Sequence, residues 1–204
     1  MKLKTTSICL FALVLFFSLG FVRLGRAANQ ITYSTQDNPK TNGVVFSVNY
    51  PADYEFVDNP SYPSQLFVAY TNEPEFPTVM GVIINPVPES LPEFSFKDFD
   101  EEMVTKWVND SLAVPGTNPQ ILKKLKTSHK GHDVIRASGM VDQVLLDEIQ
   151  PSIEELLFVT YKNLNITLVC TVFNSQKNLN ILKHFYDRGG FQPCNDFFSS
   201  LTLP

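Results

Sequence analysis

Three residues that could bind a metal flank one predicted turn at Gly131. They are His129, His132 and Asp133, and a later predicted helix carries His184. Imidazole nitrogens and carboxylate oxygens are ligands of zinc, which can activate a bound water for hydrolysis. The spacing differs from strong motifs such as His-Glu-x-x-His, and residues at a hairpin tip are usually exposed. We therefore predict no metal site, and a metal-assisted hydrolase using the first three residues is the alternative function.

No other residue pattern in the sequence indicates catalysis. The nucleophile motif Gly-x-Ser-x-Gly is absent, and the run Ala137-Ser138-Gly139 falls inside a predicted strand. The sequence has no phosphate-binding loop and no dinucleotide-binding fingerprint. We therefore predict that the protein is not an enzyme and needs no cofactor.

Aromatic residues gather around the ends of predicted strands and a proline-rich loop. They are Tyr54, Tyr62, Phe67 and Tyr70. Amphipathic aromatic rings often serve recognition, although such rings also pack at sheet edges. We predict that these four residues form a binding surface for a protein partner, with the acidic segment Asp142–Glu148 as a second contact region.

Two of the three cysteines lie in the C-terminal part of the chain. Cys9 belongs to the apolar N-terminal segment, which leaves Cys170 and Cys194. An even pair in an oxidising compartment is compatible with a disulfide, and two separately buried thiols are the alternative. A bridge would close a loop of roughly 25 residues and stabilise the fold by about 3 kcal/mol.

The first 27 residues have the composition of a secretory signal peptide. Lys2 and Lys4 precede an apolar run over residues 8–22, and small residues stand before a predicted cleavage after Ala27. A membrane anchor is the alternative, but a spanning helix needs roughly 18 consecutive apolar residues or more. We therefore expect a secreted or periplasmic protein without membrane insertion after cleavage.

The charge of the remaining chain limits its partners. The leader holds four basic residues and no acidic one, so residues 28–204 carry 12 basic and 21 acidic residues, a formal charge of −9. Such a charge repels phosphate backbones and anionic lipids, which argues against nucleic acid as a partner. The length suits a single domain over residues 44–204, and we expect a monomer.

The N-terminal half of this domain reads as strands followed by a helix. Strands are predicted at Val44–Tyr50, Leu66–Tyr70 and Val79–Ile84, with a loop over Asp53–Ser64. Residues 28–43 are polar and aperiodic, so we predict a flexible arm or a loosely docked first strand. The helix is predicted to begin at Ser95, and its apolar stripe consists of Phe96, Phe99, Met103, Val104, Trp107 and Val108.

Two hairpins and two helices are predicted in the C-terminal half. The hairpins span Ile121–Met140 and Leu156–Phe173, with an exposed loop over Asp142–Ser152 between them. The strand at the end of the second hairpin has apolar residues on both faces, which predicts a central position. An amphipathic helix ends at Gly189-Gly190, and Asn195 could cap a last short helix. Helices before and after the antiparallel strands imply a sheet between helical layers.

The order of these elements resembles the PsbP-like superfamily, which includes the Ran guanine-nucleotide-release factors. The likeness covers about Val44–Leu203 and rests on Phe46–Tyr54, in which a strand ends at Pro51 and an aromatic follows. That aromatic is commonly Trp in such proteins and is Tyr54 here. Further support comes from the Phe-rich helix, the hairpin around Gly131, the long second hairpin and the closing Phe-Phe-Ser-Ser-Leu.

The resemblance implies an α+β fold, an α/β/α sandwich with a central, mainly antiparallel sheet. It also implies binding rather than catalysis, because known members are an accessory subunit of photosystem II or a partner of a small GTPase. The expected function is therefore that of an exported, soluble, non-catalytic binding protein from a bacterium, either periplasmic or secreted. A secreted effector directed at a host is one form of this function.

Overall fold

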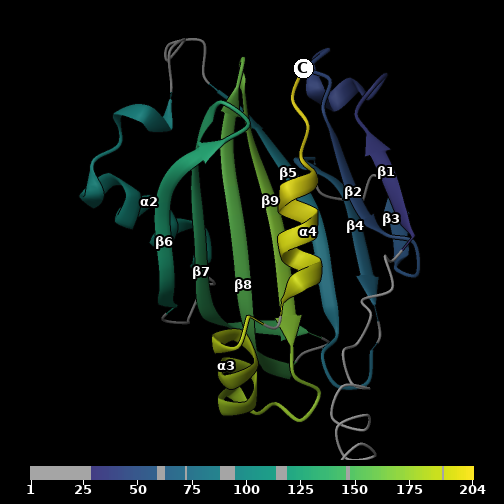
Figure 1. The fold of residues 1–204 in the computed structure, drawn as a ribbon, viewed down its shortest axis with the longest axis vertical. Helices are drawn as coiled ribbons and strands as arrows, with labels where there is room; N and C mark the ends of the chain where they lie inside the picture. Colours follow the sequence, from purple (N-terminus) through teal and green to yellow (C-terminus); the bar gives the residue numbers. More distant parts are fainter. Residues whose placement is uncertain are drawn as a thin grey trace, which may run out of the picture.

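A seven-stranded antiparallel sheet forms the centre of the protein in the computed structural model (Figure 1). The structure describes residues 29–58, 63–71, 73–87, 95–113, 119–145, 148–189 and 191–204. The strand order is β3-β4-β5-β9-β8-β7-β6. In that order the strands are β3 (Glu55–Asp58), β4 (Gln65–Thr71), β5 (Thr78–Pro86), β9 (Leu164–Phe173), β8 (Glu148–Tyr161), β7 (His132–Leu145) and β6 (Gln120–His129).

Strand β9 lies at the middle of this sheet, as its apolar pattern predicted. It pairs with β5 on one side and β8 on the other, and nine of its ten residues are buried. Both predicted hairpins are confirmed, β6–β7 and β8–β9. A strand that buries both faces needs cover on each side, and the two layers described next provide it.

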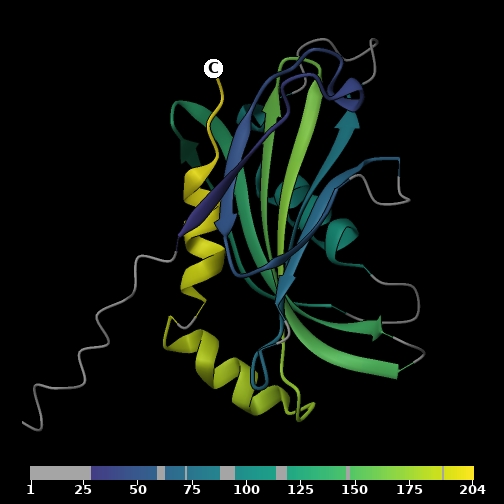
Figure 2. The same cartoon turned by 90° about the vertical axis from the view of Figure 1, so that its right-hand side faces the viewer.

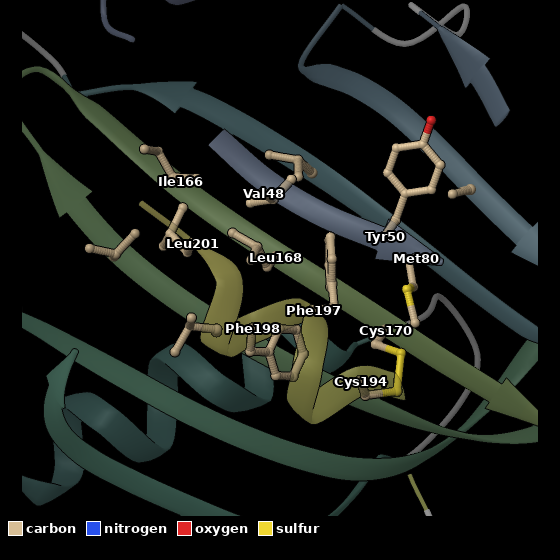
Figure 3. Packing of buried hydrophobic residues seen from close by; sticks show 14 of the residues in the cluster. Val48, Tyr50, Met80, Ile166, Leu168, Cys170, Cys194, Phe197, Phe198 and Leu201 are labelled. Carbon is tan, nitrogen blue, oxygen red and sulfur yellow. A yellow bond between two sulfur atoms is a disulfide. The ribbon is translucent and has the colours of Figure 1, made fainter. Parts of the chain in front are cut away.

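One face of the sheet is covered by two helices and a small second sheet. The helices are α3 (Leu179–Asp187) and α4 (Gln192–Ser200), and the second sheet pairs β1 (Gln30–Ser34) with β2 (Ser47–Pro51). Side chains of α4 and β2 meet those of β9 in one apolar cluster (Figure 3). The cluster includes Val48, Met80, Leu168, Phe197 and Leu201.

The opposite face is covered by α2 (Glu101–Leu112) and the short 3₁₀ helix η2 (Phe96–Asp98). Figure 2 shows the sheet from its side, with α4 and β1–β2 on one side and α2 on the other. A second apolar cluster fills this interface and includes Phe96, Val104, Val108, Leu156 and Phe158. The molecule therefore has the predicted α/β/α arrangement, with an added β layer beside α4.

The helix predicted from Ser95 is interrupted. The Ser95 side chain caps η2 by accepting from the Lys97 amide, and the chain is then extended at Phe99. Helix α2 begins only after Asp100, whose carboxylate accepts a hydrogen bond from the Met103 amide at 2.8 Å. The break changes which residues of α2 face the sheet, so Met103 is 51% exposed instead of lying on the apolar stripe.

Segments predicted as an arm and as loops contain strands. Residues 28–43, predicted as a flexible arm or a first strand, include β1, which pairs with β2. The predicted loop Asp53–Ser64 contains β3, and the predicted loop Asp142–Ser152 consists largely of the paired ends of β7 and β8. Strands β1 and β3 are exposed over nearly their whole length, so no buried alternation marks them in the sequence. Asn195 lies inside α4, and the residue before that helix is Phe191.

Within the described residues, no helix has the length and apolar character needed to span a bilayer.

Candidate functional site

A cavity of about 390 Å³ lies between the sheet and the last two helices. We call it the polar pocket. Strands β6, β7 and β8 form its floor, and α3, the connection to α4 and α4 itself form its sides. Its lining residues are Lys123, Arg136, Ala137, Ser138, Glu155, Tyr186, Asp187, Gly189, Phe191 and Asn195.

Antiparallel pairing brings the floor residues together from distant parts of the chain. Lys123 on β6 pairs with Ser138 on β7, and Ser138 pairs with Glu155 on β8. Residues directly opposite each other in neighbouring strands point to the same face of the sheet. Arg136 precedes Ser138 by two positions on β7 and therefore points to that face as well. Two cationic groups, a hydroxyl and a carboxylate thus share one surface.

Arg136 and Glu155 form an ion pair at the base of the pocket. An Arg136 terminal nitrogen donates to Glu155 Oε2 at 3.1 Å, and the same nitrogen donates to the Asn195 carbonyl of α4. Glu155 is 5% exposed. Burial raises the pKa of the Glu155 carboxyl, and the hydrogen bond and charge of Arg136, with the charge of Lys123, partly offset this rise. Arg136 also lies over the Phe198 ring, 5.4 Å from its centroid.

Helix α3 contributes a second hydrogen-bonded pair. The hydroxyl oxygens of Ser138 and Tyr186 lie 2.6 Å apart. Burial raises the pKa of the Tyr186 hydroxyl, and the hydrogen bond with Ser138 acts in the opposite direction. The next residue, Asp187, forms an ion pair with Lys183 one turn earlier, at 2.8 Å.

A disulfide fixes α4 beside the pocket. Cys170 on β9 is bonded to Cys194 on α4, which selects the bridge over the two separate thiols (Figure 3). Cys170 pairs in register with Glu155, so the bridge lies next to the buried carboxylate. Asn195 follows Cys194 directly, and the covalent link therefore holds the amide that accepts from Arg136.

Three of the four aromatic residues predicted as a binding surface lie among the described residues, and these three do not share one face. Phe67 is 0% exposed and packs among other rings, with its centroid 4.6 Å from Tyr33. Because Phe67 has no exposed surface, it cannot touch a partner directly. Tyr62 lies outside the described residues.

Tyr54 and Tyr70 are partly exposed, but they lie on different sides of the sheet. Tyr54 lines a cavity of about 290 Å³ together with Phe76 and Phe185, and burial is the main cause that raises its pKa to about 12. Tyr70 follows Ala69 on β4 and points away from it, toward the other face. Its hydroxyl lies 2.5 Å from the Glu55 carboxylate.

The residues of the alternative metal site do not converge. His129 Nε2 lies 3.1 Å from the Leu201 carbonyl oxygen, near the C-terminus. His132 instead contacts the ring of Tyr161 edge-on. His184 belongs to α3, which lies at the far end of the sheet from the C-terminus (Figure 1). In the part of the chain that the structure describes, no three His, Cys, Asp or Glu side chains are placed to hold a metal ion.

Glu154, on the face of β8 opposite to the polar pocket, should make stability depend on pH. Its carboxylate accepts from Gln143 Nε2 at 2.9 Å and from the Thr171 hydroxyl, yet burial raises its pKa from 4.5 to about 7. The folded protein therefore favours the neutral form of the Glu154 carboxyl. This preference contributes fully to stability below about pH 4.5, and the contribution is lost as the pH rises through about 7.

Glu154→Gln is therefore expected to stabilise the protein at pH 8 by about 1–2 kcal/mol, a value kept small because the side chain is only partly buried. The same change should flatten the stability profile between pH 4.5 and 8. Urea unfolding at several pH values measures both effects. Glu102→Gln, on the exposed surface of α2, is the matched control. Equal profiles for wild type and Glu154→Gln would contradict the assignment.

The residues of the polar pocket are not among those predicted from the sequence. The sequence does contain an indication of them, because Arg136 and Glu155 are charged residues within strands that are apolar around them. A charge in a buried strand is costly unless it is paired. Two opposite charges in neighbouring predicted strands therefore indicate a pair, although the helices that complete the pocket cannot be placed in this way.

The fold is similar to those of two solved structures. Cyanobacterial PsbP (CyanoP) from Synechocystis sp. PCC 6803 matches with a TM-score of 0.50 and 16% identity, covering 92% of this chain and 99% of the other. The Ran-binding protein Mog1p of Saccharomyces cerevisiae matches with a TM-score of 0.56 and 12% identity, covering 87% and 96%. No family model matches the sequence, and no curated protein matches it. The chain thus has the PsbP-like fold that its sequence resembles.

Proposed function

We propose that the protein is an exported, non-catalytic binding protein and that the polar pocket is its binding site. The observation that carries this proposal is the pocket itself, in which charged and hydroxyl groups from three strands and two helices meet at a cavity of about 390 Å³. This volume lies within the range of small-ligand sites. Ion pairs, hydrogen bonds and the disulfide hold the groups in place, as a preformed site requires.

Export is supported by two independent features. The first 27 residues have the basic start, apolar core and small final residues of a signal peptide. The disulfide between Cys170 and Cys194 suits an oxidising compartment, where such bonds form and persist. We propose that the protein is located in the periplasm or in the extracellular medium. If it is a secreted effector, it is delivered from there to a host cell.

The chemistry of the pocket favours binding over catalysis. Among the described residues that line the pocket, Ser138 is the one serine or threonine; it is 2% exposed, and its hydroxyl is hydrogen-bonded with that of Tyr186. A serine nucleophile needs a base within hydrogen-bond reach. No histidine is among the described residues that line the pocket. Glu155, the carboxylate nearest in register, is already held by Arg136.

A protein is the partner that one of the two similar structures favours. Mog1p, which has the same fold, is a Ran-binding protein. Lys123 and Asp187 line the pocket and are exposed, so we expect that a terminal group of a partner chain can reach it as readily as a free small molecule.

Export is tested by fractionating the producing cells and identifying the N-terminus of the purified protein by mass spectrometry. The expected mature protein begins at or near Ala28 and is found outside the cytoplasm. Alkylation before and after reduction should label Cys170 and Cys194 only after reduction. A protein that stays in the cytoplasm with its leader attached and both thiols free would overturn the exported function.

A further inference from the structure

The charges around the polar pocket leave one positive charge without a carboxylate partner. Glu155 is paired with Arg136, and Asp187 is paired with Lys183. Lys123, at the exposed rim, forms no ion pair with a described residue, although its charge acts on Glu155. The four charged lining residues sum to zero, and Lys123 is the one of them whose charge no ion pair with a described residue neutralises.

The pocket also holds hydrogen-bond donors that have no acceptor among the described residues. One terminal nitrogen of Arg136 serves Glu155 and Asn195, and among the described residues its other N–H groups have no acceptor. Ser138 and Tyr186 share one hydrogen bond, so one of the two hydroxyl hydrogens is left to donate. At the base of the pocket, Glu155 Oε2 and the Asn195 carbonyl already accept from Arg136. A ligand group that accepts hydrogen bonds is the one that fits.

The buried carboxylate limits how negative this ligand can be. Glu155 lies in the floor with little contact to solvent, so a group with two negative charges, such as a phosphate, meets repulsion from it that water screens weakly. A carboxylate carries one charge and two acceptor oxygens, which suits the one unpaired ammonium group of Lys123 and the N–H and O–H donors beside it. We propose that the polar pocket binds a carboxylate group of its ligand, between Lys123 and Arg136. This inference rests on the proposed function and names the chemistry of that site.

A carboxylate can reach the pocket from two sources. One is a small organic acid, whose apolar part would lie against Phe191 in the pocket wall. The other is the C-terminal carboxylate of a partner protein. The two sources present the same carboxylate to the same donors. The geometry of the pocket therefore does not distinguish them, and a binding experiment with one compound for each source does.

Calorimetric titration of the mature protein at pH 7 and low salt tests the inference. Phenylacetate is expected to bind, and phenylacetamide, which has the same shape without the charge, is expected to bind at least tenfold more weakly. N-acetyl-Gly-Phe with a free carboxylate, compared with its C-terminal amide, represents the partner-protein source. Whichever acid binds more tightly identifies the source. Inorganic phosphate is the probe for a doubly charged anion.

Two variants that each lose one positive charge test whether phenylacetate binds in the polar pocket. Lys123→Gln is expected to weaken phenylacetate binding about tenfold, because it removes a charged donor. Lys106→Gln removes the same charge from the exposed side of α2 and is expected to leave binding unchanged. Lys123→Arg should retain most of the affinity.

The outcomes separate the inference from the proposed function. Equal affinity for the acid and the amide, both sensitive to changes in the pocket, would overturn the carboxylate and leave a binding pocket in place. Tighter binding of phosphate than of either acid would overturn it too. Failure of both acids to bind at millimolar concentration would also reject it, whereas export is judged separately by fractionation.

Discussion

Phe67→Ala is expected to lower the free energy of unfolding by about 3–5 kcal/mol, the cost typical of removing a fully buried phenylalanine. The ring lies at the centre of an aromatic group, with centroids of Tyr33, Phe56 and Tyr50 at 4.6, 5.5 and 5.8 Å. Removal leaves a cavity that the fixed β1–β2 layer above it fills poorly. Urea unfolding at neutral pH measures the change.

Phe56→Ala is the matched control for this prediction. Phe56 belongs to the same aromatic group but is 37% exposed on the edge strand β3. Its removal is expected to cost about 1 kcal/mol, as for other partly exposed side chains. Equal losses in the two variants, or a Phe67→Ala protein as stable as wild type, would show that Phe67 is not part of the core.

Removing the disulfide is the second large effect that we expect. The Cys170→Ala/Cys194→Ala variant should lose about 3 kcal/mol of stability, because the bridge restricts a loop of 24 residues in the unfolded chain. Alanine keeps both positions apolar, which suits two fully buried sites. The loss should appear in denaturant unfolding, and wild-type protein in reducing buffer should show a similar loss.

The same double variant should weaken the polar pocket. The bridge holds α4, and with it Asn195, against the strand next to Glu155. Without the bridge, the affinity for phenylacetate is expected to fall by several-fold. Asn195→Ala is the control, because it removes the contact with Arg136 but keeps the disulfide. A double variant with wild-type stability and wild-type affinity would contradict the role that we give to the bridge.

The sheet could be predicted where burial leaves a regular pattern. Strands β8 and β9 alternate or continue apolar residues over most of their length, and the turn of the first hairpin contains Gly131, a residue type that adopts positive φ readily. The short exposed strand β3 has no such pattern. Its residues belong to the sheet only because the edge of β4 offers hydrogen bonds.

The candidate site could not be predicted from spacing along the chain. Lys123, Ser138 and Glu155 are 15 and 17 positions apart, and only the register of two hairpins places them side by side. Phe67 and Tyr70, two of the aromatic residues predicted as a binding surface, lie apart for a related reason. Neighbours in a strand point to opposite faces, so Phe67 enters the core while Tyr70 lies on the other side of the sheet.

We expect the polar pocket between β6–β8 and α3–α4 to be the binding site. Titration of ¹⁵N-labelled mature protein with phenylacetate, followed by amide chemical shifts, tests it most directly. The largest shifts are expected at Arg136, Ser138, Glu155, Gly189 and Asn195, and they should be strongly reduced in Lys123→Gln. Shifts that centre on Tyr54 and Phe76, or that are unchanged in Lys123→Gln, would contradict the claim.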